Sequence, residues 1–284
     1  MGCEYENYTE TSKTYDGGRV PTGSADFVEI LKKHFNGRRD LSLLEAGCGT
    51  GNYLEALAPH VDRLTGLDLN EGMLSRAREK LERHSNVTLL QGSLLEPLPF
   101  EDATFDVAVI SQVLHHVTTE GDTANIGKVL GRLQRVLKPN GLLLVNHSTA
   151  EQEAAHWYTH IMPKAVERFG ARTLSAQQMK ATMEAVGFSS VEALVKRDIF
   201  TNSKAFNDLG GPFTKAWRDL DSLWGLLSAQ ELNDALEKYA KMPQEERERL
   251  FEEHEQQRRR ETNVFRTEHE RRSTEGIGAG RRSL

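Results

Sequence analysis

The sequence is poor in cysteine and contains no long apolar run, and each absence excludes a class of protein. Two cysteines occur among 284 residues, which excludes a disulfide framework and a thiolate-rich zinc site. No apolar run approaches the length of a membrane-spanning helix, and the opening residues MGCEYENYTE lack the apolar segment of a signal peptide. We therefore expect a cytoplasmic protein with no metal site and no membrane partner.

Basic charge is also in short supply. The chain carries 36 Lys and Arg residues against 42 Asp and Glu residues, so its formal net charge is −6. A field of this sign does not attract nucleic acid, and the basic stretch RRSTEGIGAGRRSL is too short to reverse it. We expect no nucleic-acid partner.

Apolar runs of strand length alternate with amphipathic segments from Leu41 to Arg197. The runs in LSLLEA, TFDVAVISQV and GLLLVNHS are suited to burial on both faces, whereas NIGKVLGRLQRVLK repeats with a helical period. This alternation is typical of a doubly wound, mostly parallel sheet covered by helices, and we predict an α/β fold. Three helix starts are predicted by side-chain caps, at Asn70, at Ser175 with Gln178 and at Ser228 with Glu231.

The stretch LLEAGCGTGNYL holds three glycines, Gly47, Gly49 and Gly51, between a predicted strand and a predicted helix. Parallel sheets bind ligands at such a turn. The third glycine comes one residue early for the dinucleotide fingerprint G-x-G-x-x-G, and Asn52 stands in its place. The preceding Glu45 would repel a pyrophosphate, whereas it could hold a cationic or amino-bearing ligand. The loop therefore argues against a nicotinamide cofactor.

Four motifs stand in order along the chain. They are EAGCGTG, LTGLDLNEGML, LLQGSLLEPLPFEDATFDVAVISQVLHHV and LQRVLKPNGLLLV. Together they resemble the motifs of class I S-adenosylmethionine-dependent methyltransferases. The resemblance covers about Tyr15 to Arg197, and within the family it points to the small-molecule branch, near the enzymes that methylate quinone precursors. It implies S-adenosylmethionine as cofactor, a seven-stranded Rossmann-like sheet and methyl transfer by in-line displacement to an oxygen, nitrogen, sulfur or carbon of a small acceptor.

The resemblance also assigns cofactor contacts. Asp68, at the end of the second strand, would accept hydrogen bonds from the ribose hydroxyls, and its alternative role is a charge at a helix N-terminus. Ser93 stands where many relatives carry an aspartate that binds the adenine amino group. The other cofactor residues assigned are Tyr15, Arg19, Glu45, Ala46, Gly47, Cys48, Gly49, Gly51, Leu69, Met73, Leu94, Ser111 and Gln112.

Candidates for acting on the acceptor follow the fourth and fifth strands. His115 and His147 have side chains that titrate near neutrality, so either could take a proton or orient a substrate, whereas His116 is expected to pack against a helix. Trp157 and Tyr158 either form a wall of the substrate site or belong to the core. Tyr15 is also expected to line the channel for the methyl group, as part of a lid that carries Arg19.

The chain is predicted to divide into five parts. Residues 1–23 form the N-terminal lid, 24–200 the cofactor-binding core, 201–261 a helical insertion, 262–268 the last strand and 269–284 a basic tail. Two other functions remain open at this point. An RNA or protein methyltransferase would usually show a basic face or a docking module, and neither is evident in the sequence. The second is a non-catalytic cofactor-binding module, against which the intact glycine motif argues. The sequence leaves the acceptor and the oligomeric state open.

Overall fold

A computed structural model describes residues 7–12, 15–17, 21, 23–195, 204–258 and 263–268 of the chain. Its strands are β1 (Ser42–Ala46), β2 (Arg63–Asp68), β3 (Val87–Gln91), β4 (Phe105–Ser111), β5 (Leu137–Asn146), β6 (Ser189–Val195) and β7 (Asn263–Glu268). They form one sheet in the order β3-β2-β1-β4-β5-β7-β6. Strands β1 to β5 pair in parallel, whereas β7 lies antiparallel between β5 and β6. The predicted α/β class with a parallel sheet is confirmed.

The central strands are buried along their whole length, which explains why their sequences show no polar alternation. Every residue of β1 and of β4 is buried. The strand order reverses between these two strands, because β2 and β3 extend the sheet on one side and β5 on the other. A ligand site is therefore expected beyond the carboxyl ends of β1 and β4.

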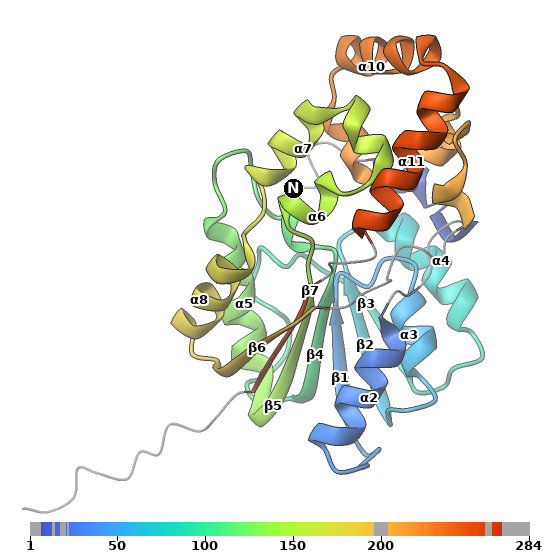
Figure 1. Ribbon diagram of the computed structural model, residues 1–284. Helices are drawn as coiled ribbons and strands as arrows, with labels where there is room; N and C mark the ends of the chain where they lie inside the picture. Colours follow the sequence, from blue (N-terminus) through green and yellow to red (C-terminus); the bar gives the residue numbers. More distant parts are fainter. Residues whose placement is uncertain are drawn as a thin grey trace, which may run out of the picture.

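Helices cover both faces of the sheet (Figure 1). Helices α2, α3 and α4 lie over one face and α5 and α8 over the other, each with an apolar core against the strands. The predicted helix starts at Asn70 and Ser175 are confirmed, since each side chain accepts a hydrogen bond from the third residue after it. The bounds are α2 (Ser24–His34), α3 (Asn52–Leu57), α4 (Glu71–Leu81), α5 (Ala124–Val136) and α8 (Ala176–Ala185).

A second layer of helices stands above the carboxyl ends of the strands (Figure 1). We call this layer the cap, and its core is a cluster of aromatic side chains that includes Trp157, Trp217 and Tyr239. The predicted capping box of Ser228 and Glu231 begins one of its helices. The cap consists of α6 (Ala150–Ala154), η3 (Trp157–Ile161), α7 (Pro163–Gly170), η4 (Lys204–Asn207), η5 (Gly211–Phe213), α9 (Lys215–Arg218), η6 (Ser222–Leu226), α10 (Ala229–Lys241) and α11 (Gln244–Arg258), where η marks a 3-10 helix.

The N-terminal segment, α1 (Tyr8–Thr11) and η1 (Tyr15–Gly17), is fastened to the glycine loop and to α4. Asp16 accepts a hydrogen bond from the Thr50 hydroxyl at 2.6 Å and pairs with the Lys80 ammonium at 2.9 Å. The Asn70 amide donates to the Thr9 hydroxyl at 3.1 Å. These contacts hold the segment over the carboxyl ends of the strands.

Candidate functional site

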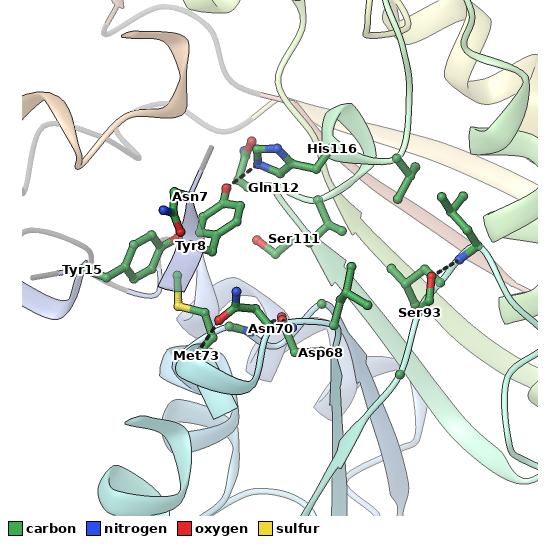
Figure 2. A pocket seen from close by; sticks show the side chains of 18 of the residues that line it. Asn7, Tyr8, Tyr15, Asp68, Asn70, Met73, Ser93, Ser111, Gln112 and His116 are labelled. Carbon is green, nitrogen blue, oxygen red and sulfur yellow. Dashed lines mark hydrogen bonds between the residues drawn. The ribbon is translucent and has the colours of Figure 1, made fainter. Parts of the chain in front are cut away.

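A cavity of about 910 Å³ lies beyond the carboxyl ends of β1, β2 and β4, where the strand order reverses. The N-terminal segment contributes to it together with the cap, and Figure 2 shows Tyr15 and Ser93 at opposite sides of the view. Ten of the residues predicted to hold a cofactor line this cavity. They are Tyr15, Gly47, Gly49, Asp68, Leu69, Met73, Ser93, Leu94, Ser111 and Gln112.

The carboxylate of Asp68 is held by two backbone amides at the edge of this cavity. Gly49 N donates to Oδ2 at 2.8 Å, and Asn70 N donates to Oδ1 at 2.8 Å. Burial raises the pKa of Asp68, and these backbone hydrogen bonds oppose the rise. A carboxylate oxygen has two lone pairs, so each oxygen can accept one more hydrogen bond from a ligand.

Two glycines of the loop are needed for different reasons. Gly47 has φ +79°, and a Cβ there would lie 2.5 Å from Cγ2 of Val113, so this residue allows the loop to pack against the segment after β4. Gly49 has φ +53°, and a Cβ there would meet nothing within 4 Å. The loop is therefore packed on one side and open to the cavity at Gly49.

Four predicted cofactor residues are absent from the cavity lining, namely Glu45, Ala46, Cys48 and Gly51. Glu45 is buried beneath the loop, where desolvation and the Asp68 carboxylate raise its pKa well above the usual value. Burial also raises the pKa of the Cys48 thiol, which favours its protonated form. The carboxylate that lines the cavity is therefore Asp68, and Glu45 lies outside the lining. Arg19 lies outside the described residues.

A polar row forms the floor of the cavity at the end of β4. The Asn146 amide donates to the Ser111 hydroxyl at 3.0 Å and to the Tyr53 hydroxyl at 3.2 Å. The Gln112 amide donates to the Ser148 hydroxyl at 3.1 Å. Gln112 has φ +53°, a left-handed conformation that costs free energy for a residue with a Cβ. The row is fixed by hydrogen bonds, and the strained turn directs the chain from β4 into η2 (Leu114–His116).

His116 and Tyr8 face each other across the upper part of the cavity (Figure 2). The sequence analysis assigned His116 to helix packing and gave Tyr8 no role. The N-terminal segment carries Tyr8 to the histidine, and both residues line the cavity. The signal for His116 was its place directly after His115, beyond the fourth strand. No signal in the sequence pointed to Tyr8, because the pairing depends on how the N-terminal segment docks.

The other predicted catalytic residues lie elsewhere. His147 is 1% exposed, with Nε2 2.6 Å from the Thr173 hydroxyl and 3.2 Å from the Leu174 carbonyl oxygen. Burial lowers its pKa to about 4, and it does not line the cavity. Trp157 and Tyr158 also lie outside the lining, as part of the aromatic core of the cap. The geometry therefore places these three residues in packing positions. His115 lines a smaller adjoining cavity.

Comparison with known proteins points to methyltransferases. Residues 44–145 match the family model described as a methyltransferase domain. This domain belongs to the class I S-adenosylmethionine-dependent methyltransferases. The matched segment runs from β1 to β5, so it holds the glycine loop, Asp68, Ser111 and Gln112, whereas Asn146 and Ser148 of the polar row follow it directly.

One curated relative of this methyltransferase domain is a demethylmenaquinone methyltransferase of Staphylococcus aureus strain MRSA252. It is 31% identical over 142 residues, which cover 47% of this chain and 56% of that protein. The chain thus spans little more than half the length of the curated relatives it matches.

Two solved structures share the fold. A candidate methyltransferase from an antibiotic biosynthesis pathway of Anabaena variabilis is 18% identical, with a TM-score of 0.66 over 88% of this chain and 98% of that one. Phosphoethanolamine N-methyltransferase 2 of Haemonchus contortus, in complex with phosphomonomethylethanolamine and S-adenosylhomocysteine, is 18% identical with a TM-score of 0.57. That match covers 93% of this chain and 58% of the Haemonchus chain.

Proposed function

We propose that the protein is an S-adenosylmethionine-dependent methyltransferase that acts on a small molecule. The observation that carries this proposal is the position of Asp68, which is held by the amides of Gly49 and Asn70 at the edge of the large cavity. The carboxylate keeps acceptor capacity for a ribose, and the open side of Gly49 leaves room for a ligand.

The described residues fit the parts of this cofactor. Leu69, which is 41% exposed, and the buried Met73 supply apolar surface beside Asp68, where an adenosine would lie. Ser93 provides a hydroxyl on the same side, and its own oxygen accepts a hydrogen bond from Leu95 N at 3.1 Å. Ser111 and Gln112 line the cavity at the end of β4, where the methionine part would be placed. The cofactor would supply an electrophilic methyl group on a sulfonium.

A small acceptor is supported by the way the cavity is covered. Tyr8 and Tyr15 line it from the N-terminal segment and Gly225 lines it from the cap. We therefore assign residues 1–23 as a lid, 24–200 as the cofactor-binding core, 201–261 as an insertion that completes the cover, 262–268 as the last strand and 269–284 as a tail. A folded protein or an RNA helix would need an open face, and the net charge of −6 gives no attraction for RNA.

Within this proposal, His116 is the histidine placed to act on the acceptor. It lines the cavity next to Gln112, and its Nε2 lies within hydrogen-bond distance of the Tyr8 hydroxyl. A neutral imidazole can take the proton of an acceptor that arrives protonated, and the tyrosine orients the ring.

Calorimetry tests the proposal directly. S-adenosylhomocysteine should bind at one site per chain and raise the melting temperature of the protein, because it binds the folded state alone. NADH, titrated in the same way, should give no heat. Tight binding of NADH without binding of S-adenosylhomocysteine would overturn the proposal. Release of S-adenosylhomocysteine from S-adenosylmethionine in fractionated metabolite extracts then identifies the acceptor.

A further inference from the structure

Helix α4 contains a glycine that the helix itself does not need. Gly72 is the second residue of α4, and its backbone is helical rather than in the left-handed conformation that favours glycine. Glycine is less favourable than alanine inside a helix, because it loses more backbone freedom when the chain folds. The first turn is already capped, since Oδ1 of Asn70 accepts from Met73 N at 3.0 Å. The reason for a glycine at this position therefore lies outside α4.

The missing side chain of Gly72 makes room for α1, which packs against α4. A Cβ atom at Gly72 would lie 3.3 Å from Cα of Thr9 and 3.3 Å from Oγ of Ser12. Carbon atoms in favourable contact are about 3.5–4.0 Å apart. Cα of Thr9 belongs to the main chain, so it cannot rotate away from an added atom. A side chain at position 72 would therefore displace α1 from α4.

The same place joins α1 to the carboxylate that is proposed to hold the ribose. The Asn70 amide donates to the Thr9 hydroxyl at 3.1 Å, and Asn70 N donates to Oδ1 of Asp68 at 2.8 Å. A Cβ atom at Gly72 would approach Oδ1 of Asn70 to 3.0 Å, so it would crowd this side chain as well. Gly72 thus lies where α1 and Asn70 meet on α4.

The position of α1 determines where the Tyr8 hydroxyl lies. Tyr8 precedes Thr9 in α1, and its hydroxyl oxygen is 2.6 Å from Nε2 of His116 (Figure 2). Because α1 is a single short helix of four residues, a displacement of Thr9 also displaces Tyr8. Hydrogen bonds weaken steeply when their geometry is lost, and a misplacement of about 1 Å at an active site can lower the rate about 100-fold. The contact of α1 with Gly72 therefore affects the Tyr8–His116 pair.

We propose that Gly72 is a positioning residue, whose missing side chain lets α1 approach α4 closely enough for Tyr8 to contact His116. Gly72 does not line the cavity, so it acts through α1. This inference rests on the proposed function, because the pair serves the reaction only if the cavity binds the cofactor and an acceptor. A residue that is unfavourable for α4 is thus favourable for the site.

Substitutions at two helical glycines test the proposal. Gly72→Ala and Gly72→Leu are compared with Gly131→Ala and Gly131→Leu in α5, where a Cβ atom would lie 4.0 Å from Cγ1 of Val186. The ring signals of His116 are observed by NMR in ligand-free protein labelled at histidine, and they are assigned with His116→Gln. Both Gly72 variants should move these signals toward their positions in Tyr8→Phe, and the larger shift is expected for leucine. The Gly131 variants should leave the signals unchanged.

Two further measurements separate positioning from a role in folding. The melting temperature of Gly72→Ala should equal or exceed that of the wild-type protein, since alanine favours the helix. Dissociation of S-adenosylhomocysteine, followed by stopped flow, should be roughly fivefold faster or more in Gly72→Leu, because α1 no longer covers the cavity correctly. The dissociation rate of Gly131→Leu should match that of the wild-type protein.

Unchanged His116 signals in Gly72→Leu overturn the proposal. If this variant fails to fold, unchanged signals in Gly72→Ala overturn it in the same way. A melting temperature of Gly72→Ala below that of the wild-type protein also overturns it, because the glycine would then serve the fold of α4. Failure of S-adenosylhomocysteine to bind the wild-type protein would instead contradict the proposed function, and the NMR comparison does not depend on that binding.

Discussion

The hydroxyl oxygen of Tyr8 lies 2.6 Å from Nε2 of His116, although 108 residues separate the two in the sequence. Their rings meet edge to face, with centroids 5.3 Å apart and an interplanar angle of 87°. Tyr8 belongs to α1 and His116 to η2, so this one pair joins the N-terminal segment to the end of β4 across the cavity. The contact that covers this part of the cavity therefore also positions the histidine.

Replacing Tyr8 with phenylalanine should separate the hydroxyl from the packing of the ring. We expect Tyr8→Phe to lower turnover roughly 100-fold, the lower end of the range for a positioned acid–base group, while affinity for S-adenosylhomocysteine changes less than threefold. Initial rates with the identified acceptor measure the first quantity and calorimetry the second. Tyr239→Phe is the control, because it removes a hydroxyl that donates to the Leu209 carbonyl in the cap, outside the cavity lining. Full turnover in Tyr8→Phe would remove the pair from the chemistry.

Asp68→Asn should weaken cofactor binding, and because an amide nitrogen cannot accept a hydrogen bond, it should also lose the bond from Gly49 N or the one from Asn70 N. The asparagine keeps the size of the side chain but lacks the negative charge and one acceptor oxygen of the carboxylate. A hydrogen bond to a charged group contributes about 1.5–3 kcal/mol. We expect affinity for S-adenosylhomocysteine to fall about 10- to 100-fold by calorimetry. Asp62→Asn, at an exposed position before β2, serves as the comparison. Equal affinity in wild type and Asp68→Asn would contradict the ribose role.

The glycine loop predicts two different responses to alanine. Gly47→Ala drives a methyl group into Val113 at a positive φ, so we expect it to lower the free energy of unfolding by about 1–3 kcal/mol. Gly49→Ala meets no neighbour, so it should cost less stability and instead weaken ligand binding. Urea denaturation of both variants measures the difference. Val113→Ala in the Gly47→Ala background should recover part of the loss, and a Gly49→Ala protein less stable than Gly47→Ala would refute the assignment.

The fastening of the N-terminal segment predicts a kinetic effect. The Asp16 side chain is 40% exposed, so its pair with Lys80 contributes at most about 1 kcal/mol to stability. Asp16→Asn should therefore leave the melting temperature nearly unchanged while S-adenosylhomocysteine dissociates several-fold faster. Stopped-flow displacement gives the dissociation rate. Asp40→Asn, which removes an exposed pair with Arg38, should leave that rate unchanged. An unaltered rate in Asp16→Asn would exclude a lid fastened at this point.

His147 predicts how stability depends on pH. Its pKa falls from 6.5 to about 4 on burial, so between these values the unfolded chain binds a proton that the folded chain does not. Stability from this group is complete above pH 6.5 and is lost as the pH falls to about 4, up to about 3 kcal/mol at about 1.4 kcal/mol per pKa unit. Denaturation curves from pH 7.5 to 4 should show a smaller loss for His147→Gln than for wild type. Parallel losses in the two proteins would contradict the shift.

The sheet and the cofactor side of the cavity could be predicted from the sequence because they depend on local order. Apolar runs, caps such as Asn70 and the glycine spacing each depend on a few adjacent residues. The sheet topology then determines where the strand ends meet. Asp68 and Ser111 follow from that rule together with the resemblance to the methyltransferase family. Gly47 and Gly49 follow as well.

The part of the cavity beneath the cap could not be predicted, because it is assembled from segments far apart in the chain. His147 ends an apolar strand, as a catalytic residue would, yet the side chain turns toward Thr173 and is buried there. The sequence predicted that His116 packs against a helix, and only the docked N-terminal segment shows its contact with Tyr8. Trp157 and Tyr158 have the composition of a substrate wall and of a core alike, and only the packing of the cap assigns them to the core.

The way the cap is attached to the sheet determines how freely its length and sequence can vary. The chain leaves the sheet after Val195 and returns at Asn263, and these two residues face each other in the ladder between β6 and β7. The part of the cap from η4 to α11 is thus a long excursion between two strands that are already paired, whereas α6, η3 and α7 lie between β5 and α8. Each doubling of such an excursion adds only about 0.6 kcal/mol of closure entropy. Length and sequence can therefore change over the acceptor while the register of the sheet, and the cofactor half that it carries, stays the same.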